Sequence, residues 1–115
     1  MEISIEKRGH VDLLSLKGKL DAGTAGALEQ KLLAAIDAGG NHVLLNCSGV
    51  SYVSSAGLRV LLMAAKKLKS TKGQIALAGL QPHIREVFDI AGFSSIFPIH
   101  DTDESGLRAL QNPPT

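Results

Sequence analysis

Residues 42–69 carry the clearest structural signal of this chain and read HVLLNCSGVSYVSSAGLRVLLMAAKKLK. The run His42–Cys47 is short, apolar and bounded by turn-forming residues, which predicts a buried strand. From Ser54 or Ser55 to about Lys69, apolar side chains recur at the spacing of one helical face. The stretch therefore predicts a central strand that leads through a pair of serines directly into a helix, as in α/β proteins.

Strand and helix signals continue to alternate on both sides of this stretch. The expected strands are 2–6, 11–16, 42–47, 74–78 and 96–99, and the expected helices are 24–38, 54–69, 82–91 and 103–110. The first two strands form a hairpin, and each later strand is followed by a helix. This order predicts an α/β fold with a mixed sheet, right-handed crossovers and about four helices packed against the sheet.

Glycine and proline set the boundaries of these elements. Arg8-Gly9 supplies the hairpin turn, and we expect the second strand to end within residues 18–21. Gly92 is the expected left-handed end of the third helix, with Phe93 packing back onto that helix. Pro98 lacks an N–H donor and therefore places the last strand at an edge of the sheet.

Length and composition limit the possible functions. The chain has 115 residues, which fits a single domain over residues 1–110 followed by a short flexible tail, 111–115. Twelve basic residues against eleven acidic ones give a net charge of +1, which argues against a direct nucleic-acid partner. No apolar run reaches the roughly 18 residues of a membrane span, and no signal peptide is evident, so we expect a cytoplasmic protein without membrane insertion.

The sequence offers little material for catalysis or for a cofactor. It contains no Walker-type phosphate loop, no Gly-x-Gly-x-x-Gly and no His-Glu-x-x-His. Its four histidines are far apart, and its single cysteine, Cys47, is expected to be buried and unreactive. We therefore expect no cofactor, no metal site and no enzyme activity.

The pair Ser54-Ser55 lies between the central strand and its helix, where functional residues of α/β proteins collect. One serine could simply cap the helix. A phosphate on a serine here would instead meet free backbone N–H groups and the positive end of the helix dipole, while adding nearly two negative charges to the surface. A nucleophile elbow at Ser55 is disfavoured, because Val53 stands where that motif needs a small residue.

Four segments of the chain form a recognisable set in a fixed order. They are Gly18-Lys19-Leu20-Asp21 with Thr24, Val43–Asn46 followed by Val50–Val53, Ser54-Ser55-Ala56-Gly57-Leu58, and Pro82–Phe93. Together they cover nearly the whole chain and resemble the STAS domain, specifically the bacterial anti-sigma factor antagonists. Ser54 and Ala56 depart from the family pattern, which often has Asp and then Ser or Thr at these positions.

The resemblance implies a partner-switching function. An unphosphorylated antagonist captures a serine kinase of the histidine-kinase-like ATPase type, which is usually also the anti-sigma factor. Phosphorylation at the position of Ser55 breaks this capture, and a metal-dependent serine phosphatase restores it. The alternative is a constitutive STAS subunit of a bacterial lipid-transport or other membrane-associated complex, in which Ser55 only caps the helix.

The same resemblance points to a partner-binding surface around Ser55 on a protein that is monomeric when free. Asp21 and Thr24 each have two interpretations, since they could contact the partner or cap the first helix. Arg59 lies one helical turn beyond Ser55 and is a candidate for the docking surface. The expected partner-binding residues are Asp21, Thr24, Ser54, Ser55, Ala56, Gly57 and Arg59.

Overall fold

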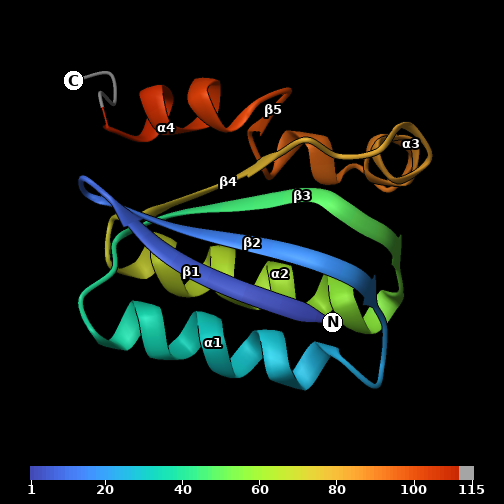
Figure 1. Cartoon of the computed structure of the whole chain (residues 1–115), viewed down its shortest axis with the longest axis horizontal. Coiled ribbons are helices and arrows are strands. Elements are labelled where there is room, and N and C mark those ends of the chain that lie inside the picture. Colours follow the sequence, from blue (N-terminus) through green and yellow to red (C-terminus); the bar gives the residue numbers. More distant parts are fainter. Residues whose placement is uncertain (112–115) are drawn as a thin grey trace.

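The computed structural model describes residues 1–111 and contains one mixed five-stranded sheet (Figure 1). The strands lie in the order β1-β2-β3-β4-β5, where β1 is antiparallel to β2 and the other neighbours are parallel. Their bounds are β1 Glu2–Arg8, β2 Val11–Leu20, β3 His42–Val53, β4 Gln74–Ala78 and β5 Ile99–His100. The expected hairpin, strand–helix alternation and mixed sheet are confirmed. The last four residues of the predicted tail, 112–115, lie outside the described part of the chain.

Four α-helices in the described residues cover the sheet from two sides (Figure 1). Their bounds are α1 Ala25–Asp37, α2 Ser55–Ser70, α3 Pro82–Ile90 and α4 Asp103–Gln111. Helices α1 and α2 pack on one face over the larger apolar core, while α4 covers a smaller cluster on the opposite face. The predicted helices therefore match the structure to within one or two residues at each end.

The central strands are longer than their apolar runs. β2 ends at Leu20, inside the expected interval, but β3 continues six residues beyond Cys47. The extension holds because residues 17–20 of β2 pair with residues 49–53 of β3, with two register irregularities. Ser48-Gly49 resemble a turn and concealed the extension in the sequence, although Val50, Tyr52 and Val53 beyond them favour a strand. The extended end of β3 delivers the chain to the start of α2.

The predicted strand 96–99 is wrong in position. Residues Phe93–Ser95 form a short 3₁₀ turn, and β5 contains only Ile99 and His100. Phe97 is buried by edge-to-face contacts with Phe88 and Phe93 rather than by sheet pairing, and its ring centroid lies 6.3 Å from each of theirs. The left-handed Gly92 (φ 80°), the return of Phe93 onto α3 and the edge position of β5 are confirmed.

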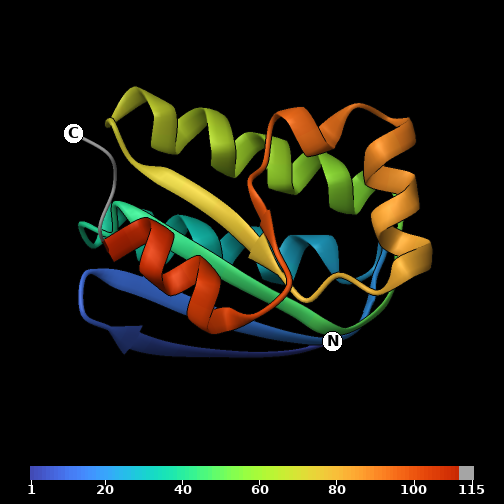
Figure 2. The same cartoon turned by 90° about the horizontal axis from the view of Figure 1, so that it is seen from above.

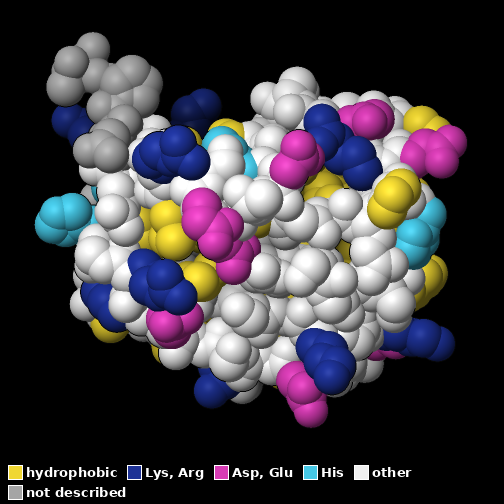
Figure 3. Space-filling view, turned by 45° about the horizontal axis from the view of Figure 1, so that its top comes forward, with side chains coloured by type: hydrophobic (Ala, Val, Ile, Leu, Met, Phe, Trp, Pro, Cys, Tyr) yellow, Lys and Arg dark blue, Asp and Glu magenta, His cyan; other side chains and the backbone are white. Residues whose placement is uncertain are grey.

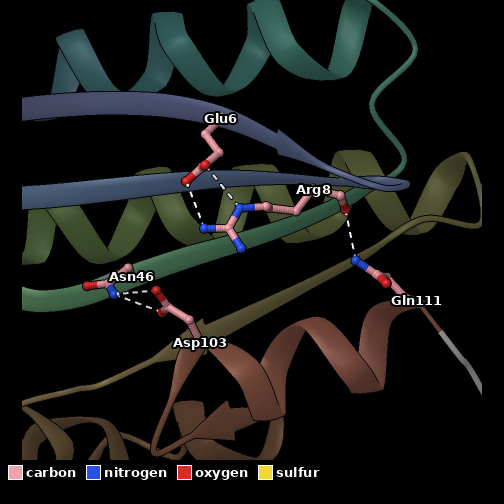
Figure 4. Close-up of polar contacts among 5 residues, drawn as sticks. All are labelled: Glu6, Arg8, Asn46, Asp103 and Gln111. Carbon is pink, nitrogen blue, oxygen red and sulfur yellow. Dashed lines mark hydrogen bonds and ion pairs between the residues drawn. The ribbon is translucent and has the colours of Figure 1, made fainter.

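Polar contacts fasten α4 to the sheet (Figure 4). The Asn46 amide on β3 donates to both carboxylate oxygens of Asp103, at 2.8 and 2.9 Å. At the other end of α4, the Gln111 amide donates to the backbone oxygen of Arg8 at 2.9 Å. Gln111, which we expected in the tail, is therefore the last residue of α4 and part of the folded unit.

Candidate partner-binding site

Ser54 is the N-cap of α2. Its backbone is extended (φ −91°, ψ 173°), and its hydroxyl oxygen accepts a hydrogen bond from the Gly57 N–H at 3.3 Å. Its own N–H donates to the Leu20 oxygen at 2.8 Å. The sequence left open which of the two serines is the cap, and the structure assigns this role to Ser54. The interpretation of Ser55 as the cap is wrong.

Ser55 is the first residue of α2, and its side chain is exposed. Its hydroxyl makes no hydrogen bond with the described residues. The N–H groups of Ser55 and Ala56 likewise have no partner there, because the cap hydroxyl uses the Gly57 N–H and the Leu58 N–H bonds to the Ser54 oxygen. A free hydroxyl therefore lies beside free amides at the positive end of a 16-residue helix.

The loop between β2 and α1 is closed by its own side chains. The Asp21 carboxylate accepts hydrogen bonds from the Gly23 N–H at 3.0 Å and the Thr24 N–H at 3.2 Å. The Thr24 hydroxyl accepts from the Asp21 N–H at 2.9 Å and donates to the Lys19 oxygen at 2.8 Å. Thr24 occupies the N-cap position of α1, one of the two roles the sequence left open for it, but neither its side chain nor that of Asp21 bonds to an amide in the first turn of the helix.

Two contacts join this loop to the start of α2. One is the hydrogen bond from Ser54 to Leu20. The other is the packing of Gly57, where an added Cβ would lie only 2.6 Å from the Leu20 Cγ and 3.0 Å from the Leu20 oxygen. We call this contact between the β2–α1 loop and the start of α2 the joint. Gly57 is buried within it, whereas Asp21 and Thr24 are half-buried at its surface.

The surface around the joint contains two further side chains. Arg59 is exposed one turn beyond Ser55 and forms no ion pair with the described residues. Tyr52 pairs with Lys19 at the end of β3 and is 51% exposed. Sequence reasoning did not select Tyr52, although an exposed aromatic residue next to the serine pair is typical of interfaces.

The first turn of α3 is tied to the same end of β3. The Gln81 amide donates to the Ser48 oxygen at 3.0 Å, and the His83 Nε2 lies 3.0 Å from the Ser51 oxygen. The extended end of β3 is thus held by α3 on one side and by β2 on the other, so the serine pair starts from a fixed backbone.

The geometry offers no catalytic arrangement at the serine pair. Among the described residues, only Lys72 combines a side chain with a positive φ, so the turn at Ser54 lacks the backbone strain of a nucleophile elbow. Cys47 is buried, as predicted, and burial raises the pKa of its thiol to about 12. No group of three His, Cys, Asp or Glu residues in the described part could hold a metal ion.

The surface carries charges of both signs. On the face shown in Figure 3, basic and acidic side chains are interspersed, with small apolar areas between them. A uniformly basic surface, as a nucleic-acid partner would need, does not occur on this face. No helix in the described residues is long and apolar enough to cross a membrane.

Comparison with known proteins places these features in a family. The family model described as the STAS domain matches residues 2–111. This chain belongs to the STAS domain family. The serine pair of this STAS domain thus lies where the sequence resemblance predicted, at the start of the helix that follows the central strand.

Similar proteins bear the names of anti-sigma factor antagonists. BtrV of Bordetella bronchiseptica, whose name describes such an antagonist, is 39% identical over 111 residues, which cover 96% of each chain. The anti-sigma-B factor antagonist of Listeria monocytogenes is 31% identical over 90% of this chain and 93% of its own. The solved structure of an anti-sigma factor antagonist from Mycobacterium paratuberculosis has a TM-score of 0.88 at 26% identity, covering 96% and 94% of the two chains.

Proposed function

We propose that this STAS domain is a cytoplasmic anti-sigma factor antagonist that works by partner switching. In its unphosphorylated form it captures a serine kinase of the histidine-kinase-like ATPase type that is also an anti-sigma factor. Phosphorylation of Ser55 releases this partner, and a metal-dependent serine phosphatase resets the protein. It acts as a binding protein and not as an enzyme.

The observation that carries the proposal is the division of roles in the serine pair. Ser54 caps α2, so the hydroxyl of Ser55 is exposed and is not needed for the fold. A kinase can therefore reach it without unfolding the helix. The free amides of Ser55 and Ala56 and the helix dipole would then accommodate the phosphate.

The proposed docking surface surrounds Ser55. It consists of the exposed Arg59 and the half-buried Asp21, Thr24, Ser54 and Ala56, and Gly57 shapes it from beneath. A phosphate at its centre would have to be desolvated for docking, and it would repel acidic groups of the partner. The switch therefore needs no refolding of the domain.

Ser54 affects how well the phosphate is tolerated. A carboxylate at position 54 would repel a phosphate on Ser55, and this sequence has a hydroxyl there instead. We expect phosphorylation of Ser55 to cost less folding stability here than in a Ser54→Asp variant. Thermal unfolding of both proteins with and without the phosphate measures this difference, and a larger loss in the natural sequence would contradict it.

The decisive experiment is affinity capture from native cell lysate with mass spectrometry. Wild type, Ser55→Asp and the charge control Ser4→Asp on the exposed outer strand are compared. We expect wild type and Ser4→Asp to retain a histidine-kinase-like ATPase and Ser55→Asp to lose it. Addition of ATP to the captured complex should then place phosphate on the peptide that contains Ser55.

Two outcomes would refute the switch. If the Ser55→Asp protein retains the same ATPase as wild type, phosphorylation cannot be the release signal. If all three proteins retain the same membrane-transport subunits and ATP leaves Ser55 unmodified, the domain is a constitutive subunit of a membrane-associated complex.

A further inference from the structure

A groove lies beside β4, toward the C-terminal end of α2. It has a volume of about 660 Å³, within the size range of ligand sites. Its lining is mostly apolar and includes Leu62, Ala65, Ile75, Ile96, Ala109 and Leu110. The α2 residues that line the groove run from Leu62 to Lys69, seven to fourteen residues beyond Ser55, which corresponds to roughly 10–21 Å along the helix, and none of the proposed docking residues lines it. The groove is therefore separate from the proposed switch.

One side of the groove is an unpaired strand edge (Figure 2). β5 pairs only with Leu77 and Ala78, at the C-terminal end of β4. The Leu77 N–H donates to the Pro98 oxygen, and strand alternation directs the N–H and C=O of Ile75 to the same edge. No hydrogen bond of the described residues reaches Ile75 on this edge.

Pro98 explains why β5 does not cover this edge. Leu77 of β4 lies opposite Ile99 of β5. If the pairing continued in this register toward Ile75, the N–H of residue 98 would have to donate to the Ile75 oxygen. Proline has no N–H to donate. The chain before Pro98 turns away into the 3₁₀ turn Phe93–Ser95, and Ile96 becomes 48% exposed in the groove wall.

The charges in the groove lining are basic. Lys66 and Lys69 line the groove, are exposed and form no ion pair within residues 1–111. Their neighbour Lys67, by contrast, pairs with Asp37 on α1 at 3.2 Å. No acidic residue lines the groove. An occupant with carboxylates therefore meets two free ammonium groups and no opposing charge.

We propose that this groove binds an extended, acidic segment of a partner protein as an added strand beside β4. The segment's backbone pairs with the N–H and C=O of Ile75, as in other cases of strand addition. Alternate side chains of the segment bury apolar groups against Leu62 and Ile96, while carboxylates reach Lys66 and Lys69. A helix or a small anion would leave the backbone groups of Ile75 unused, so an extended chain fits best.

The test uses a phage-displayed random heptapeptide library as the probe. Peptides are selected on wild type and then measured against Lys66→Glu/Lys69→Glu and a matched control, Lys17→Glu/Lys31→Glu, which makes the same charge change on other exposed lysines. We expect selected peptides with acidic residues between β-branched or aromatic residues. They should bind the groove variant at least tenfold more weakly than wild type and bind the control variant normally.

Three further measurements separate strand addition from simple charge attraction. In two-dimensional NMR spectra the amide of Ile75 should shift most on binding. N-methylation of one central peptide residue should weaken binding at least tenfold, because it removes an N–H. Ala109→Trp, at an exposed position in the groove wall, should block binding without lowering the melting temperature.

Each contrary result would overturn the proposal. If every selected peptide binds the groove variant as tightly as wild type, the charged groove is not the peptide-binding site. Binding that is unaffected by N-methylation at every position would exclude strand addition. A loss of peptide binding in Ser55→Asp would place the peptide at the switch instead of at β4.

Discussion

The starts of α1 and α2 look alike in sequence and differ in structure. Both helices follow strands and begin with small and hydroxyl-bearing residues. Before α1, the side chains of Asp21 and Thr24 form hydrogen bonds within their own loop and close it. Before α2, Ser54 alone makes the cap bond, and Ser55 has no structural task. Because Ser54 makes the cap hydrogen bond, the Ser55 hydroxyl remains available for modification.

The two starts also differ in how tightly their glycines are packed. An added Cβ on Gly57 in α2 would clash with Leu20, whereas a Cβ on Gly26 in α1 would meet nothing within 4 Å. The tight contact fixes α2 against the loop before α1. The start of α2 is therefore fixed against the loop before α1, and the Ser55 hydroxyl at this start forms no hydrogen bond within residues 1–111.

The largest expected effect comes from breaking this joint. Gly57→Val should destabilise the protein by about 3 kcal/mol, because its side chain must displace Leu20 and the backbone of the loop. Gly26→Val is the matched control and should change the unfolding free energy by about 0.5 kcal/mol or less. Urea unfolding measures both values. Equal effects at the two glycines would mean that the joint is not tight.

Exchanging the two serines for alanine gives the next largest effect. Ser54→Ala should cost about 1 kcal/mol, since it leaves the Gly57 N–H without its cap. Ser55→Ala should change stability by less than about 0.5 kcal/mol, because its hydroxyl has no partner in the described chain. The same unfolding measurements test this pair, and a larger loss for Ser55→Ala would reverse the assignment of roles.

A smaller effect is expected in the loop before α1. Thr24→Val removes two hydroxyl hydrogen bonds but keeps the shape of the side chain, and should cost about 0.5–1 kcal/mol. Hydrogen exchange should show faster exchange of the Asp21 and Thr24 amides and unchanged exchange in α2. Faster amide exchange at the start of α2 as well as in the loop would show that the loop also stabilises α2.

The smallest effect concerns α3 and its pH dependence. Hydrogen bonds from Ser94 and Arg85 lower the pKa of the exposed Asp89. Its contribution to stability is therefore present above the ordinary carboxyl pKa and is lost as the pH falls through the lowered value. Asp89→Asn should reduce the fall in melting temperature between pH 5 and pH 2 slightly. An unchanged or steeper fall in this variant would contradict the assigned cause.

The fold was largely predictable because its buried elements have strong periodicity. Strand β4 is a short apolar run between turn residues, and its bounds were predicted correctly. The end of β3 was missed because Ser48-Gly49 were read as the turn that ends the apolar run, whereas pairing with β2, a non-local cause, carries the strand on to Val53. β5 was misplaced because Phe97 is buried by other aromatic rings, and an apolar run alone does not distinguish the two kinds of burial.

The site was predictable in place but not in detail. The motif around Ser54 and Ser55 indicated a helix start, yet a cap bond depends on backbone angles that the sequence does not show. Tyr52 was missed because its exposure depends on the extended pairing of β3. Local sequence patterns therefore predict most of the fold. The exposed surface of the site depends on contacts between segments that are distant in the sequence, and local patterns do not show these contacts.

The position of α4 has a consequence for the synthesis of the protein. Among the helices of residues 1–111, α4 is the one that packs on the cluster of Val11, Leu13, Leu44, Ala76 and Ala78 on its face of the sheet. On the ribosome, β1 to β4 have been made roughly 25 residues before α4, so the apolar face that these strands form stays uncovered until α4 has been made and docks. Chaperone contacts should therefore concentrate on this face and end when Asp103 reaches Asn46 and Gln111 reaches Arg8.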